Sequence, residues 1–265
     1  IRELLSHRAG VFDVFNDPIK KAPYNGRPYA EYVEQVLNEP DHQFTADELV
    51  GVVAANNLRY ADAERKSGFK YSDTGYSILA KIVERVAGKS YDRFLAENFF
   101  APLALTRTSA PWSPYDSMPP EPYLPGYARM RSDDDFAEVT ECNMSDQIGP
   151  GNIVSTAADM GRWIRTLLSG RGPLSEEQVA RMMRVPEGNS TYALGIGNSE
   201  AGAGHSGAHP GYINLVAYHP PDDVAVVVVT PFIDYSKLPE QLAFITALAK
   251  DARKIAGFET PWPVK

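Results

Sequence analysis

The sequence is poor in cysteine, with Cys142 as its one copy among 265 residues. A single cysteine excludes an internal disulfide and any thiolate cluster that would hold zinc or an iron–sulfur centre. Long apolar runs are also missing. The longest, Val224 to Val229, is far shorter than the roughly 20 residues of a membrane-spanning helix and suits a buried strand. We therefore expect neither a cysteine-bound metal nor a membrane span.

Basic charge is scarce as well. There are 26 Lys and Arg against 34 Asp and Glu, the net charge is -8, and no Lys/Arg cluster occurs, which argues against nucleic acid as a partner. His42, His209 and His219 are not at metal-ligand spacing with one another, and there is no His-x-x-x-His and no pair of carboxylates near them in the sequence. The acidic run Asp133 to Asp135 lacks the glycine and downstream glutamate of a calcium loop. We expect no metal and no cofactor.

The chain that remains has an ordinary globular composition, with 43% hydrophobic residues, enough for a sizeable core. Residues 1–185 read as a mostly helical lobe, and residues 186–265 as antiparallel strands followed by a helix, together one structural unit. Helices first, then a strand meander, then a helix predict the α+β class, with an antiparallel sheet flanked by helices.

Periodicity and capping residues set the expected elements. A helix follows Gly75 and ends at Gly88, a second begins after Ser90, and a third begins after Ser155 or Thr156. The N-cap of the first of these helices is assigned to Asp73 or Thr74. The remaining expected elements are strands 192–196, 204–208, 213–218 and 224–230 and a final helix 238–255.

A loop rich in proline and aromatic residues interrupts the helical lobe at residues 111–127. Its prolines interleave with Trp112, Tyr115 and Tyr123, so regular structure is not expected there. Two interpretations remain open. The loop is either a stiff surface segment or an aromatic wall beside a binding cleft.

Two short matches to catalytic motifs fail on context. "AGKS" at 87–90 lacks the glycine that a phosphate-binding loop needs at position 83 and joins two helices, where such a loop follows a strand. "SGFK" at 67–70 matches Ser-x-x-Lys, but that chemistry needs the serine at a helix N-terminus, with the lysine one turn later on the same face. Here the motif lies in a loop, so we do not assign Ser67 as a nucleophile.

Two further motifs are uninformative separately but indicate a family when they are considered together. "YSDTGY" at 71–76 precedes the strongest predicted helix, and "GHSGAHPGY" at 204–212 lies in a Gly-rich strand and turn. Alone, the first would be a helix cap and the second a tight turn. Tyr-Ser-Asp before a helix and His-Ser-Gly on a later strand resemble the second and third motifs of the superfamily of penicillin-binding proteins and class C β-lactamases, which carry Tyr-x-Asn and Lys/His-Thr/Ser-Gly.

The resemblance extends from residue 1 to about residue 255. "IRELLSHRAGV", "GFKYSDTGYSILAKIVERVAGKSYDRFLAENFFAPL", "GPGNIVSTAADMGRWIRTLL" and "YALGIG" follow the pattern of the superfamily in its order. It implies a β-lactamase/transpeptidase-like fold. It also implies that the first motif, Ser-x-x-Lys on a core helix, and two N-terminal strands belong to a separate or cleaved segment that is absent from this sequence.

On this resemblance, Tyr71 is the general base that takes the serine proton and later protonates the leaving group. His205 stands at the position of the third-motif lysine, where it would face the cleft from an edge strand and hold a substrate carboxylate. Ser206 would hydrogen-bond that carboxylate or an ester group, Gly207 would let the substrate backbone approach, and the amide of Ala208 would be one oxyanion donor.

Asp73 departs from the asparagine of the superfamily. An ionised aspartate can only accept hydrogen bonds, whereas asparagine also donates, and the carboxylate adds negative charge beside the expected lysine. We expect weaker recognition of β-lactams and peptide amides and a preference for another acyl substrate such as an ester. His7 stands where the superfamily has a packing and hydrogen-bonding residue, so it receives no catalytic role.

The resemblance implies an acyl-serine hydrolase for esters, D-amino-acid amides or peptides, or β-lactams, complete only with the Ser-x-x-Lys segment. Its partners would be that segment and a small acyl substrate. The compartment stays open, and the family resemblance is compatible with a periplasmic or secreted location. The alternative is a non-catalytic binding or scaffold protein that has kept the cleft and lost the nucleophile.

Overall fold

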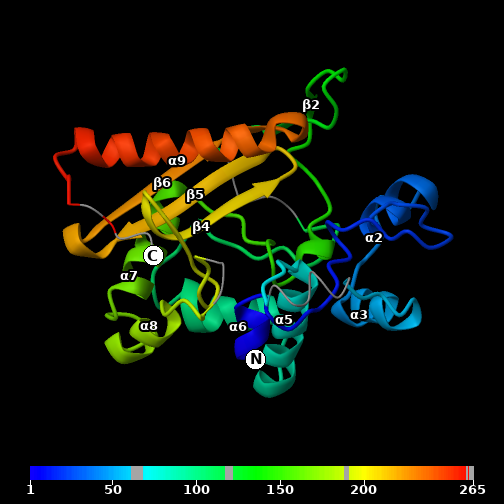
Figure 1. Ribbon diagram of the computed structural model, residues 1–265, viewed down its shortest axis with the longest axis horizontal. Coiled ribbons are helices and arrows are strands. Elements are labelled where there is room, and N and C mark those ends of the chain that lie inside the picture. Colours follow the sequence, from blue (N-terminus) through cyan, green and yellow to red (C-terminus); the bar gives the residue numbers. More distant parts are fainter. Residues whose placement is uncertain (61–67, 117–121, 188–190, 261, 263–265) are drawn as a thin grey trace.

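The computed structural model describes residues 1–60, 68–116, 122–187, 191–260 and 262. A four-stranded antiparallel sheet has the order β3-β4-β5-β6, formed by β3 (Gly197–Ser199), β4 (Gly202–His209), β5 (Tyr212–His219) and β6 (Val224–Thr230). Helices cover both of its faces (Figure 1). This arrangement confirms the α+β class and the antiparallel sheet flanked by helices.

The side chains of β5 alternate between two cores. Ile213, Leu215 and Ala217 pack under α9 (Leu238–Ile255), which supplies Ile245 and Ala249. Figure 1 shows α9 lying along one face of this sheet, and its bounds agree with the predicted helix.

The opposite face of the sheet packs on α7 (Ala157–Leu168) and α8 (Glu176–Met182). Val216 and Tyr218 contribute to that second core together with Ile164 and Leu167. The side-chain period of two in a strand places alternate residues in each core.

Helix α5 (Asp73–Ala87) begins at the Tyr-Ser-Asp motif. The N-cap is Ser72, whose hydroxyl accepts from the amide of Gly75 at 3.3 Å, so the assignment to Asp73 or Thr74 is wrong. The Thr74 hydroxyl instead accepts from the amide of Val14 at 3.0 Å. Gly88 adopts the left-handed conformation at the C-terminal end, with φ of 65°, as predicted. The cap therefore fixes the chain direction immediately after Tyr71.

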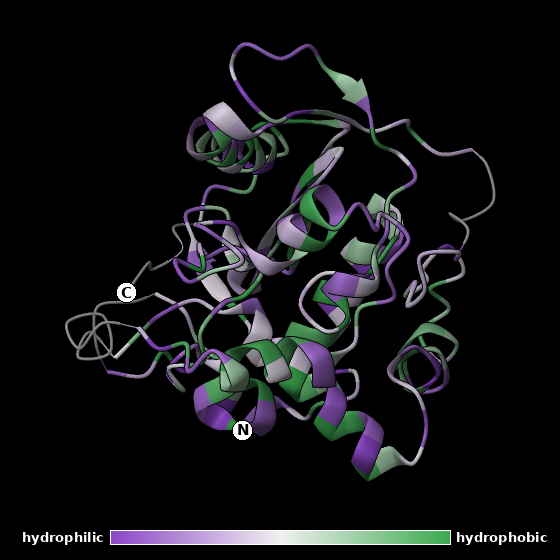
Figure 2. Cartoon of the chain, turned by 90° about the vertical axis from the view of Figure 1, so that its right-hand side faces the viewer, coloured by the Kyte–Doolittle hydropathy of each residue, from purple (hydrophilic) through white to green (hydrophobic). Residues whose placement is uncertain are grey.

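The other α-helices in the described part of the chain are α1 (Arg2–Leu5), α2 (Tyr29–Glu31), α3 (Ala46–Ala55) and α6 (Tyr91–Leu95), with π-helical turns at Tyr32–Val36 and Ala96–Phe100. In Figure 2 the helices carry both apolar and polar segments, as expected where one face is buried and the other is exposed. A separate core in this lobe contains Val14, Ile19, Val33, Phe44 and Leu49. Thr156 caps α7 by accepting from Asp159 at 3.2 Å, which decides between the two predicted caps.

Two features of the strands differ from the prediction. The expected strand 192–196 is a turn with Gly195 at φ of 75° and one bridge, from Tyr192 to Gly197. A second sheet, with the order β2-β1-β7, was missed. It is formed by β1 (Tyr127–Arg129), β2 (Ala137–Glu138) and β7 (Phe232–Asp234), and β1 and β7 are parallel. Strands of two or three residues leave no readable alternation.

Among the described residues, no helix is both long and apolar enough to cross a membrane.

Candidate active site

Tyr71 is held in place by His7, a buried residue that follows α1. The Nδ1 atom of His7 accepts from the amide of Ser72 at 3.1 Å, and its carbonyl accepts from the amide of Lys70 at 2.8 Å. The two ring centroids of His7 and Tyr71 lie 4.0 Å apart. The backbone on both sides of Tyr71 is therefore fixed by one residue, which agrees with the expected packing and hydrogen-bonding role of His7.

The hydroxyl of Tyr71 lies in an environment that keeps it protonated. Burial, and then the negative charge of Asp73, raise the pKa of this phenol above its usual value of 10. A phenolate at this position therefore needs a neighbouring cation to form near neutral pH.

Asp73 shares a polar cluster with Asp13 and Asn16. The Asn16 amide donates to Oδ2 of Asp73 at 2.8 Å and to Oδ2 of Asp13 at 3.0 Å, while the backbone amide of Asp73 donates to Asp13 at 3.2 Å. Burial, together with the charge of Asp13, raises the pKa of Asp73 to about 6. As the pH falls through a mildly acidic range, Asp73 therefore changes from a carboxylate, which only accepts hydrogen bonds, to a carboxylic acid, which can also donate one.

His205 lies on β4 directly opposite Val216, on the side of the sheet that faces α7. Its Nε2 atom is 2.9 Å from the hydroxyl of Tyr192, and its Nδ1 atom contacts the carbonyl oxygen of Ser206. Burial lowers the pKa of His205. The imidazole is neutral at physiological pH, and both of its nitrogens are already hydrogen-bonded within the protein.

Aromatic rings connect the two motifs. The ring of Tyr192 lies between the motifs, with centroids 4.8 Å from His7, 6.1 Å from Tyr71 and 5.6 Å from His205. The rings of Tyr71 and His205 are 6.4 Å apart. Tyr76, one turn into α5, lies 5.1 Å from His7 and donates to the carbonyl of Leu5 at 2.8 Å. The fold therefore brings the predicted residues of both motifs into one cluster.

The outer side of β4 is open at the His-Ser-Gly motif. Strand β3 pairs only with residues Gly202 to Gly204, so β4 has a partner on this side at its N-terminal end and none at His205 among the described residues. Beyond Gly204, the described residues provide no further strand on that side. Ser206 and Ala208 are exposed there. The backbone groups of this stretch are therefore not paired with another described strand and could pair with a ligand that runs along it.

Gly207 is required by its neighbour across the sheet. A Cβ atom at Gly207 would lie 2.6 Å from Nδ2 of Asn214, the residue paired with it on β5. The absence of a side chain therefore lets Asn214 lie against the strand, in addition to the expected approach of a substrate.

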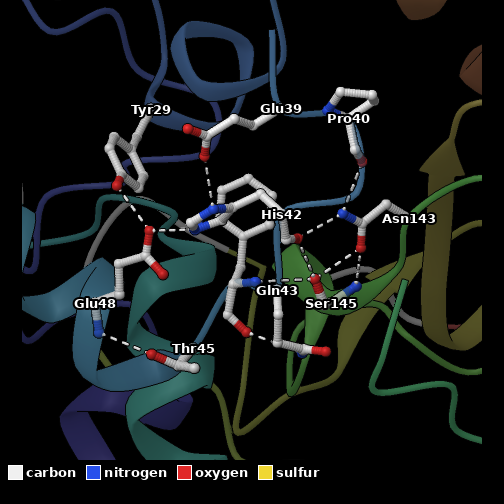
Figure 3. Close-up of polar contacts among 10 residues, drawn as sticks. Tyr29, Glu39, Pro40, His42, Gln43, Thr45, Glu48, Asn143 and Ser145 are labelled. Carbon is white, nitrogen blue, oxygen red and sulfur yellow. Dashed lines mark hydrogen bonds and ion pairs between the residues drawn. The ribbon is translucent and has the colours of Figure 1, made fainter. Parts of the chain in front are cut away.

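A second polar network holds the loop at residues 143–145 against the helical lobe (Figure 3). His42 contacts Glu39 at 3.1 Å through Nδ1 and Glu48 at 2.8 Å through Nε2. The carbonyl of His42 accepts from Asn143 at 2.7 Å and from Ser145 at 3.2 Å. His42 therefore has a structural role as a link between two segments that are distant in the sequence.

Asp146, the next residue after this loop, carries a carboxyl group that interacts electrostatically with Asp73. Burial, and the nearby charge of Glu34, raise the pKa of Asp146 to about 7. The charge of Asp73 contributes to the same shift, so Asp146 and Asp73 belong to one electrostatic environment. This environment favours a positively charged ligand group and disfavours an anion.

The possible metal ligands and the two short motifs "SGFK" and "AGKS" are the remaining candidates from the sequence. In the described part of the chain, no three His, Cys, Asp or Glu residues are arranged to hold a metal ion. Of "SGFK", Ser67 lies outside the described residues, whereas Lys70 lies 3.5 Å from Asp17 and above the ring of Tyr60. "AGKS" forms the turn between α5 and α6, as predicted from its context.

The Pro/aromatic loop presents its aromatic side chains to solvent. Trp112, Tyr115 and Tyr123 are all exposed, and residues 117–121 lie outside the described part. The backbone of Trp112 is anchored on both sides, because its amide donates to Asp116 at 2.7 Å and its carbonyl accepts from Gln43 at 2.7 Å. These contacts agree with the interpretation as a stiff surface segment.

Sequence reasoning missed three members of the site. Tyr192, Asn16 and Asp13 touch the predicted residues, yet each comes from a segment without a motif of its own. Tyr192 begins the "YALGIG" segment, which was noted only as part of the resemblance. Their roles depend on tertiary contacts that a local pattern does not report.

Comparison with known proteins gives a consistent family. The family model described as Beta-lactamase matches residues 1–231. A putative penicillin-binding protein, PbpX of Bacillus subtilis (strain 168), is 24% identical over 202 residues, covering 76% of this chain and 48% of that protein. A teichoic acid D-alanine hydrolase of Staphylococcus aureus is 36% identical over 118 residues, covering 42% of this chain and 27% of that protein. The matches thus span less than half the length of these relatives.

Solved structures share the fold. D-amino acid amidase from Ochrobactrum anthropi SV3, complexed with L-phenylalanine amide, superposes with a TM-score of 0.75 at 20% identity, over 96% of this chain and 72% of that chain. FmtA from Staphylococcus aureus superposes with a TM-score of 0.67 at 20% identity, over 98% of this chain and 62% of that chain. These likenesses support a β-lactamase/transpeptidase-like fold.

Proposed function

This chain belongs to the beta-lactamase family, and on that premise we propose that it forms the site of an acyl-serine hydrolase that cleaves aminoacyl esters or amides. The observation that carries the proposal is the meeting of Tyr71, Asp73 and His205 in one cluster, built from segments far apart in the sequence. A base and a strand with an open side are the parts that this chemistry needs on this side of the substrate.

The nucleophile in this proposal is the serine of a Ser-x-x-Lys segment outside the 265 residues. Its hydroxyl oxygen attacks the substrate carbonyl, its proton passes to Tyr71, and Tyr71 returns a proton to the departing alcohol or amine. The motif lysine supplies the positive charge that the phenolate of Tyr71 requires, because Asp73 and burial both oppose its ionisation. Water then hydrolyses the acyl-serine ester by the same route in reverse.

The strand β4 supplies the carbonyl-binding side. The amide of Ala208 is the proposed donor to the developing oxyanion, and the nucleophile's own amide is the second donor. Ser206 is exposed on the same open stretch, where its hydroxyl can bind an ester or amide group of the substrate.

Asp73 selects the substrate class. A carboxylate binds a substrate α-ammonium group, and Asp146 contributes negative charge to the same environment. Two similar proteins are named as a D-amino acid amidase and a teichoic acid D-alanine hydrolase. A free amino acid amide carries an ammonium group, so these names support an aminoacyl substrate. Because Asp73 lacks the amide donor of asparagine, we propose that β-lactams are poorer substrates than aminoacyl esters or amides.

The test is turnover by the protein isolated from its source. We expect hydrolysis of D-phenylalanine amide with a kcat/KM at least about tenfold above that of its N-acetyl derivative, since acetylation removes the ammonium charge. Asp73→Asn should reduce that ratio, and Tyr71→Phe should lower kcat by about 100-fold or more. Equal rates for both substrates would contradict the ammonium site. Binding without turnover would favour the non-catalytic alternative.

A further inference from the structure

The hydrogens around His205 follow from its two partners. Nδ1 contacts the Ser206 carbonyl, which can only accept, so Nδ1 carries a hydrogen. Burial lowers the pKa of His205 and raises that of Tyr192, so at neutral pH the imidazole is neutral and the phenol is protonated. The Tyr192 hydroxyl therefore donates to Nε2 across 2.9 Å. No ring hydrogen or lone pair of His205 is left for a substrate.

Protonation of His205 does not break the hydrogen bond between its Nε2 atom and Tyr192. Tyr76 gives its hydrogen to the carbonyl of Leu5 at 2.8 Å, so the oxygen of Tyr76, which interacts with Tyr192, can accept the hydrogen of Tyr192 whenever that hydrogen is not on Nε2. When Nε2 gains a proton, it donates to the oxygen of Tyr192, and the hydrogen of Tyr192 turns toward Tyr76. Both phenols stay protonated, and Nε2 stays on Tyr192 in either state.

We propose that Tyr192 is a specificity-determining residue, which occupies Nε2 of His205 and so withholds the imidazole from a substrate carboxylate. The inference rests on the proposed function in that it concerns the same site. It reverses the expectation that His205 binds a carboxylate. Above about pH 7, where Asp73 and Asp146 are ionised, a substrate with a free carboxylate would meet their negative charge without a compensating imidazolium. The site is thereby directed toward substrates that lack a carboxylate.

The first test reads the tautomer in the wild-type protein and needs no turnover. Nitrogen-15 NMR of labelled histidine should show Nδ1 of His205 protonated and Nε2 unprotonated at pH 7.5. The Nε2–H tautomer in the wild type would overturn the proposal, whatever the enzyme assay gives. A protein that shows the expected tautomer but no hydrolysis would instead count against the proposed function alone.

The second test compares one anionic ligand with its neutral counterpart. Acetyl-D-alanine and acetyl-D-alaninamide are titrated by calorimetry at pH 6 into wild type, Tyr192→Phe, and the double variant Tyr192→Phe with His205→Gln. Tyr192→Phe removes one hydroxyl and keeps the ring contacts with His7 and Tyr71.

In Tyr192→Phe, a bound carboxylate lies beside the freed Nε2 and favours uptake of a proton from solvent by that nitrogen, which then donates to the carboxylate. We therefore expect the affinity for the acid relative to the amide to rise about tenfold in Tyr192→Phe and to return to the wild-type ratio in the double variant. Dependence on His205 is a readout that a merely structural role of Tyr192 would not give. An unchanged ratio, or no binding of the acid to Tyr192→Phe, would overturn the proposal.

Discussion

His7 lies against Tyr71 with ring centroids 4.0 Å apart, and its Nδ1 accepts from the amide of the next residue, Ser72. His7 is 3% exposed and has a φ of 54°, in the left-handed region. One side chain thus fixes the backbone of the proposed base and packs on its ring, which makes His7 a positioning residue for the proposed reaction.

His7→Ala should therefore reduce stability by about 2 kcal/mol and kcat by about tenfold or more, because it leaves the Ser72 amide unpaired and removes the ring beneath Tyr71. His7→Asn is the matched control, since its side-chain oxygen can accept the same hydrogen bond and asparagine tolerates a positive φ. Urea unfolding should give His7→Asn a smaller loss. Equal losses for both variants would assign the effect to the ring alone.

Asp73→Asn should stabilise the protein at pH 7.5 by about 2 kcal/mol, since burial and Asp13 raise the pKa of Asp73 to about 6. A raised carboxyl pKa means that folding is favoured when the group is protonated, so the wild type gains stability as the pH falls from above 6 toward 4. The advantage of the variant should shrink over that window. Unfolding curves at pH 7.5, 6 and 4 measure it. A difference that stays constant with pH would contradict the raised pKa.

Gly207→Ala should cost about 1 to 3 kcal/mol, because the new Cβ would lie 2.6 Å from the side-chain amide of Asn214. Asn214→Ala removes the atoms that clash. In the Asn214→Ala background, Gly207→Ala should therefore cost much less stability than it does in the wild type. If Gly207→Ala is equally destabilising in both backgrounds, the contact with Asn214 is not the reason for glycine at this position.

Much of the fold was predictable because its long elements follow strong local rules. The helix from Leu238 to Ile255 and the run Val224 to Thr230 have clear periodicity or β-branched composition, and both occur as predicted. The Ser72 cap was missed, since Ser, Asp and Thr are adjacent and all are good caps. The parallel pairing of β1 with β7 joins residues about a hundred positions apart, which no local pattern encodes.

The site was predictable to the extent that it resides in motifs. Tyr71 and His205 were brought together as the resemblance implied. The orientation of His205 could not be predicted from the sequence, because it depends on Tyr192, whose position is set by ring contacts with His7 and Tyr71. The raised pKa of Asp73 likewise depends on Asp13, a neighbour only in the folded chain.

Covalent labelling with a serine-reactive phosphonate shows whether the protein is an acyl-serine hydrolase with Tyr71 as its base. Protein isolated from its source is treated with the probe, and the labelled peptide is identified by mass spectrometry, with Tyr71→Phe as the comparison. We expect one adduct, on the serine of a Ser-x-x-Lys segment outside these 265 residues, formed much more slowly in Tyr71→Phe. An adduct on Ser67, or no adduct at all, would contradict it.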